Sequence, residues 1–204
     1  MKVDPSTISA GEAYGWQAAT ILPRPIAWVA TLNEDGSANL APFSFFTGVS
    51  SDPPTVLICV ARKRKEPDGT RQRKDTWRNI ERTGEFVVHV VNAALGEPMN
   101  ATARDLPYGV DEIAQVGLTK LACDKVAAPR IAEAPVAMEC KLERIVEVGR
   151  TGTAVIIGEI LLWHISDDIL VEGRIDPHRI DAIGRMGGAG YVRTRDIFEM
   201  SRPK

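Results

Sequence analysis

The chain has 204 residues, a length that suits one domain, spanning 1–204, with a sizeable hydrophobic core. Its 44% hydrophobic and 25% charged residues are ordinary values, and a formal net charge of −2 gives no overall field to attract nucleic acid or a membrane. No apolar run approaches the ~18 residues that span a bilayer, and the first residues lack the apolar centre of a signal peptide. We therefore expect a cytoplasmic protein with no nucleic acid or membrane partner.

The first predicted elements are two strands joined by a tight turn. Residues 26–32 are almost continuously apolar, as in a strand covered on both faces, and Asp35-Gly36 supplies hairpin chemistry because glycine tolerates positive φ. After the second strand, residues 41–46 alternate small or polar residues with phenylalanines. Such a surface displays hydroxyls and aromatic rings, as a planar ligand with polar edges would require.

Further strands are predicted at 55–61, 85–91, 136–143 and 153–165. In 136–143, apolar residues alternate with Ala137, Glu139, Lys141 and Glu143, which predicts one buried face and one solvent-facing face. Strands that dominate, with a few short helices between them, favour a mainly β fold built as a closed antiparallel barrel.

Helices are predicted at 75–84 and 111–117, and a third is predicted to begin within 92–103 and to be broken at Pro98. Asp75 is the expected N-cap of the first helix, and Gly84 its C-cap. Because a helix N-terminus presents unpaired N–H groups, Lys74-Asp75-Thr76 is a candidate phosphate site. An ordinary capped surface helix would carry the same residues, so this alternative stays open.

A basic cluster lies between Arg62 and Lys74, where seven cations fall within thirteen positions. The cluster fits a solvated loop, a nucleic-acid surface or the border of a site for phosphorylated small molecules. No aromatic residues interleave the charges, which disfavours the nucleic-acid surface. We favour the border of a phosphate site, with surplus charge that would attract NADPH in preference to NADH.

Several kinds of site lack their motifs. Cys59, Cys123 and Cys140 include no Cys-x-x-Cys pair, so the spacing suggests neither disulfides nor a zinc site. The three histidines are isolated, and no nucleophile elbow or Gly-x-Gly-x-x-Gly motif occurs. We therefore expect no catalytic triad and no metal. The glycine-rich segment 184–191 is predicted to be a loop that allows close approach of a ligand or another chain.

These motifs resemble, in their order and spacing over 23–203, the flavin reductase-like family of FMN-binding split β-barrels. The resemblance is carried by 24–27 with the Asp35-Gly36 turn, 41–46, 50–54, 74–76, 109–119, 184–191 and 200–203. It implies an antiparallel Greek-key split barrel that forms a homodimer, with the flavin near the subunit interface.

The resemblance also implies the residues of an FMN site. Phe43, Ser44 and Phe45 would line the isoalloxazine, and Ser51 would bond its polar part. Arg62, Lys74, Asp75 and Thr76 would hold the phosphate. The full implied set is Arg24, Pro42, Phe43, Ser44, Phe45, Ser51, Arg62, Lys74, Asp75 and Thr76.

The function implied is an NAD(P)H-dependent flavin reductase, in which NADH or NADPH passes a hydride to flavin N5. This chemistry belongs to the cofactor and needs no general base, which agrees with the missing triad. Two alternatives share the fold: a non-enzymatic FMN-binding electron carrier, and a split-barrel oxidase that acts on a phosphorylated vitamer.

Overall fold

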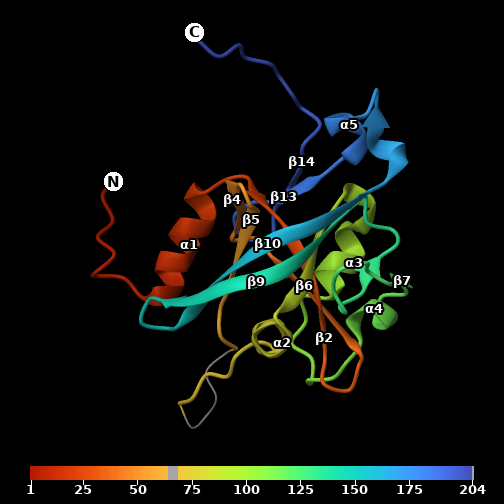
Figure 1. Cartoon of the computed structure of the whole chain (residues 1–204). Coiled ribbons are helices and arrows are strands. Elements are labelled where there is room, and N and C mark those ends of the chain that lie inside the picture. The colour runs from red at the N-terminus through yellow and green to blue at the C-terminus, as the bar shows by residue number, and fades with distance from the viewer. Residues whose placement is uncertain (64–68, 204) are drawn as a thin grey trace.

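The computed structural model describes residues 1–63 and 69–203. Its centre is a seven-stranded antiparallel sheet in the order β3-β2-β6-β9-β10-β5-β4 (Figure 1). The strands are β2 (Ala27–Leu32), β3 (Ala38–Phe43), β4 (Phe46–Ser51), β5 (Pro54–Val60), β6 (Glu85–Val90), β9 (Val136–Val148) and β10 (Thr153–Ile165). Within the described residues the edge strands β3 and β4 do not pair, and the sheet curls until β3 lies close to β5. The predicted mainly antiparallel β fold is confirmed.

Smaller elements surround this sheet. A three-stranded sheet joins β1 (Arg24–Pro25), β13 (Ile183–Arg185) and β14 (Tyr191–Arg193), and two short pairs are β7 (Lys120–Leu121) with β8 (Arg130–Ile131) and β11 (Leu170–Val171) with β12 (Arg174–Ile175). The α-helices are α1 (Ala10–Thr20), α2 (Asp75–Thr83), α3 (Gly96–Ala101), α4 (Glu112–Gln115) and α5 (Pro177–Ile180), with 3₁₀ turns η1 (Ala93–Leu95) and η2 (Asp167–Ile169). Among the described residues, every helix is too short or too polar to cross a membrane.

The sheet carries a hydrophobic core on each face, because alternate residues of one strand point to opposite sides. On β2, Val29 joins the core that α2 covers with Trp77 and Ile80. Its neighbour Trp28 joins the second core, to which α3 and α4 contribute Met99 and Ile113. The prediction that this strand is covered on both faces is therefore confirmed.

The predicted solvent face of β9 is wrong for the first half of the strand. Ala137 and Glu139 are both buried, and the side chain of Glu139 has no exposed surface, because the segment 122–135 packs over them. The alternation holds only farther along, where Lys141 and Glu143 are exposed.

Helix α2 lies where the sequence predicted it, and Gly84 closes it with a φ of 73°. The expected cap differs: Lys74 is the N-cap, Asp75 is the first helical residue, and no side chain among the described residues caps the turn. Pro98 does not break α3, since it lies in the first turn, where a missing N–H has no helical partner to lose.

Helix α1 was not predicted, although Ser9 and Glu12 form a reciprocal capping box at its start. It stands at one side of the sheet, away from α3 and α4 (Figure 1). The glycine-rich segment 184–191 packs against the chain near it. A Cβ on Gly184 would lie 3.2 Å from the side chain of Pro23, and one on Gly187 would lie 3.5 Å from the Cα of Ala19. The close approach predicted for this loop is thus made to its own chain.

Candidate functional site

A cavity of about 530 Å³ opens where α2 begins. Its walls come from the end of β3, the start of α2, the segment 102–106 and α4. It brings together many of the residues predicted to bind the cofactor: Pro42, Phe43, Arg62, Lys74, Asp75 and Thr76. The segments are distant in sequence, so only the fold makes them one surface.

The first turn of α2 gives this cavity an anion-binding end. The N–H groups at the start of a helix have no partner within the helix, and no side chain among the described residues caps them here. Thr76 is held in place because the side-chain amide of Asn39 donates a 3.0 Å hydrogen bond to its hydroxyl oxygen. The cavity walls partly desolvate the ammonium of Lys74 and lower its pKa, although much of the residue remains exposed.

Several cations of the basic cluster are already paired. Lys63 lies 3.1 Å from the carboxylate of Asp75, and Arg62 lies 2.8 Å from that of Glu147. Arg73 pairs with Glu81, and both arginines stack on the ring of Trp77. The free positive charge is therefore smaller than the sequence count suggests. Arg64 and Lys65, on which the predicted preference for NADPH also depends, lie outside the described residues.

Glu112 is a wall of this cavity that the sequence analysis did not select. The residue is only 7% exposed, and its Oε2 accepts a 3.0 Å hydrogen bond from the backbone N–H of Leu40. Burial, with smaller contributions from Asp75 and Asp111, raises the pKa of Glu112 to about 7. In the sequence, Glu112 is recognisable only as a carboxyl that directly follows the N-cap Asp111. The packing of α4 on β3 is needed to show that this carboxyl faces the cavity.

A second cavity of about 240 Å³ adjoins the first. The two share Pro42 and Phe43, so one strand end forms a wall of both. Aromatic and polar side chains line the second cavity, among them Tyr14, Ser44, Arg185 and Tyr191. Together the two adjoining cavities have a cationic end, with N–H groups that no described side chain caps, and an aromatic end with hydroxyls.

The remaining predicted residues lie around these cavities and do not line them. Arg24 is buried, and its guanidinium donates hydrogen bonds to Ser44 and to three backbone carbonyls. The ring of Phe45 packs 6.1 Å from that of Tyr14. Ser51 is exposed at the end of β4, outside the walls of both cavities. Arg24 thus positions Ser44, and direct contact of Phe45 or Ser51 with a cofactor stays a prediction.

Comparison with known proteins places this geometry in a family. Residues 19–176 match the model of the flavin reductase like domain. Nitrilotriacetate monooxygenase component B from Bacillus cereus is 31% identical, with a TM-score of 0.91 over 98% of both chains. The 2-nitrobenzoate 2-nitroreductase of Pseudomonas fluorescens is 30% identical, with a TM-score of 0.86 over 100% of this chain and 96% of that one.

A protein from Shewanella frigidimarina, described as a candidate flavin reductase with a split barrel domain, shares the fold at 20% identity. Its TM-score is 0.82 over 100% of both chains. The curved seven-stranded sheet is therefore a split barrel. The chain belongs to the flavin reductase-like family of split-barrel proteins.

Proposed function

We propose that the chain binds FMN across the two adjoining cavities and catalyses its reduction by NADH or NADPH. The observation that carries this proposal is the start of α2, uncapped by any described side chain, which opens beside Lys74 and Thr76 into a cavity adjacent to an aromatic one. A ligand with an anionic end and a planar ring end matches that arrangement.

The phosphate would be held by Lys74, by the hydroxyl of Thr76 and by the N–H groups of the first turn of α2. One compact phosphate end favours FMN over FAD, because the sequence offers no second phosphate motif for an adenylate. Arg104, which also lines the cavity, adds a further cation.

The ring would lie against Phe43 and Tyr14, near the hydroxyl of Ser44. Nε of Arg24 donates a 3.2 Å hydrogen bond to the hydroxyl oxygen of Ser44, which leaves the hydroxyl proton free to donate into the cavity. Arg185 places a positive charge at this end, 4.4 Å from the ring centre of Tyr191. Hydroxyl donors and a cation stabilise negative charge that develops on a bound ring.

When bound, the flavin supplies the acceptor for the hydride of the nicotinamide. The protein's part is to hold the nicotinamide and flavin rings close together in the orientation for transfer and to limit the access of water. Neither task needs a general base. The nitrilotriacetate monooxygenase component and the nitroreductase are named for redox reactions, which supports the assignment to oxidoreductase chemistry.

The test starts from the absorbance spectrum of the purified protein and the identity of any flavin it releases. Steady-state oxidation of NADH and of NADPH is then measured with added FMN, FAD or riboflavin. We expect turnover with FMN. Tight FMN binding without nucleotide oxidation would favour an electron carrier, and a protein without affinity for any flavin would contradict both functions.

A further inference from the structure

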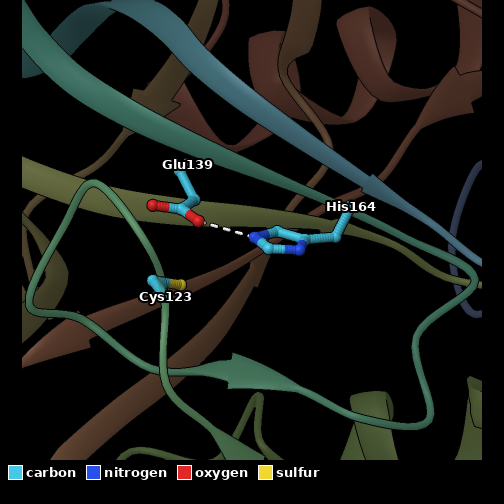
Figure 2. Close-up of side chains that lie close together, drawn as sticks. All are labelled: Cys123, Glu139 and His164. Carbon is cyan, nitrogen blue, oxygen red and sulfur yellow. Dashed lines mark hydrogen bonds and ion pairs between the residues drawn. The ribbon is translucent and has the colours of Figure 1, made fainter.

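A second cluster of reactive side chains lies away from the proposed flavin site. Cys123 belongs to the segment that follows β7, Glu139 to β9 and His164 to β10 (Figure 2). The sulfur, a carboxylate oxygen and a ring nitrogen of these residues all lie within 4.8 Å of one another. Nε2 of His164 is 2.5 Å from Oε1 of Glu139. The residues are far apart in sequence, so no spacing motif reveals the cluster.

Backbone N–H groups fix the orientation of the Glu139 carboxylate. Its Oε2 accepts hydrogen bonds from the N–H groups of Lys125, at 2.6 Å, and Val126, at 3.1 Å. Its Oε1 accepts one from Asp124, at 2.9 Å, and faces His164 and Cys123. Burial alone would raise the pKa of Glu139, but hydrogen bonds from the N–H groups of Asp124 and Lys125 and from His164 hold it below the usual value, so the buried group stays an anion.

We infer that Cys123, Glu139 and His164 form a binding site for a divalent transition metal ion, best matched by Zn²⁺. Thiolate, imidazole and carboxylate are the ligands that Zn²⁺ takes in proteins, whereas Ca²⁺ and Mg²⁺ require oxygen ligands. The ion would replace the proton that lies between Nε2 of His164 and Oε1 of Glu139. The hydrogen bonds to Glu139 then act as the outer partners that orient a ligand.

The charge balance of such a site suits its burial. One divalent cation, the Cys123 thiolate, the Glu139 carboxylate and a neutral His164 ring sum to zero. Without a metal, burial and the facing Glu139 carboxylate raise the pKa of Cys123 to about 12, so the thiol carries its proton. Binding of the ion as a thiolate complex would release that proton to solvent. Arg130, whose charge also reaches Cys123, favours the thiolate but repels a cation.

Solvent can reach the cluster, and a fourth ligand is close. The His164 side chain is 20% exposed, and Oδ2 of the 70% exposed Asp124 lies 3.7 Å from its Nε2. A water molecule would complete a tetrahedral site and keep its charge at zero, whereas Asp124 as the fourth ligand would make the charge −1. The ion would then fasten the segment that begins at Cys123 to the two longest strands of the sheet.

The experiment uses full-length protein without a histidine tag, treated with a chelator and titrated with Co²⁺ and then Zn²⁺. We expect one ion per chain, a cobalt–thiolate charge-transfer band and release of a proton from Cys123. Cys123→Ser should abolish the band and weaken Zn²⁺ about 100-fold or more, since even outer partners of metal ligands are worth 10–100-fold. His164→Gln is the second test variant. The matched controls change residues outside the cluster: Cys59→Ser for Cys123→Ser, and His178→Gln for His164→Gln.

The wild-type spectrum decides the question even if a variant fails to fold. Absence of a cobalt–thiolate band in wild-type protein would overturn the inference and leave a hydrogen-bonded cluster. A band or a Zn²⁺ affinity that persists in folded Cys123→Ser would overturn it as well. Flavin binding is a separate readout, so these results do not depend on the proposed reductase activity.

Discussion

Nε2 of His89 accepts a 3.0 Å hydrogen bond from the backbone N–H of Ile131, while its Nδ1 lies 2.9 Å from the carbonyl oxygen of Trp28. An N–H group only donates and a carbonyl only accepts, so the ring is neutral and carries its proton on Nδ1. Burial, with smaller contributions from the charges of Arg130 and His164, lowers the pKa of His89 to about 4. Only the neutral ring can make both hydrogen bonds, which link β6 to β2 and to β8.

We predict that this histidine makes folding sensitive to mild acid. The pKa of His89 is lower in the folded protein than the ~6.5 of the unfolded chain, so below pH 6.5 the unfolded chain binds a proton more readily. The contribution of neutral His89 to the free energy of unfolding is therefore complete above about pH 6.5 and is lost toward pH 4. The loss should reach about 3 kcal/mol at pH 4. Denaturant unfolding at several pH values measures it. His89→Gln should flatten the profile and His178→Gln should not; equal slopes in all three proteins would contradict the prediction.

Lys74→Ala should weaken FMN binding by about 1.5–3 kcal/mol, the range for a hydrogen bond to a charged group. Folding should hardly change, because this exposed side chain contributes little packing. Fluorescence titration of the apoprotein measures the affinity, with Lys141→Ala, an exposed lysine of β9, as the matched control. A lower melting temperature with unchanged FMN affinity would make Lys74 a structural residue.

Glu112 should make FMN binding weaken as the pH rises through 7. Its carboxyl has a pKa of about 7 and shares the cavity with Lys74, Lys63 and Arg104, so its ionisation removes net positive charge facing the phosphate. The second ionisation of the phosphate itself, near pH 6, acts in the opposite direction. Titrations at pH 6 and pH 8 should therefore be compared with those of Glu112→Gln. The variant should bind FMN several-fold more tightly than wild type at pH 8, and equal affinities there would exclude this role.

Gly158→Ala should destabilise the fold by about 1–3 kcal/mol, the usual cost of overpacking. A Cβ at this position would lie 2.4 Å from the ring of Phe86, which is fully buried in the core. Gly48→Ala is the control, because a Cβ on that exposed glycine of β4 meets no atom within 4 Å. Thermal unfolding of both variants makes the comparison, and equal melting temperatures would refute the clash.

The homodimer stays a prediction, for which exposed aromatic residues are the available support. Trp28 cannot contribute to an interface, because it is fully buried and its indole N–H donates a hydrogen bond to the hydroxyl of Thr102. Trp16 and Trp163 remain exposed, at 44% and 45%. We expect sedimentation to give twice the chain mass of 22.2 kDa. A monomer that still holds flavin would contradict the prediction.

The sequence predicted some elements from local chemistry, although it missed α1 despite the capping box of Ser9 and Glu12. The apolar run before Asp35-Gly36 and the capping glycine Gly84 both lie where expected. The prediction that Glu139 faces solvent failed, because the polarity of a residue does not reveal that another segment covers it and supplies hydrogen bonds. Glu112 was missed for a related reason, since its place in the cavity depends on how α4 packs against β3.

The guanidinium of Arg24 donates to the carbonyl oxygens of Ala18 and Ile21 near the start of the chain and to that of Met186 near its end, a partner 162 positions away. During synthesis on the ribosome, this cation cannot be satisfied until almost the whole chain has emerged. A product that ends before Met186 lacks one of the carbonyls that hold the Arg24 side chain. Arg24 would then orient Ser44 less firmly, and the aromatic cavity that Ser44 lines would be incomplete. Loss of ligand binding in such truncated products would therefore report an unfinished site, which lacks Tyr191 as well as the Met186 carbonyl.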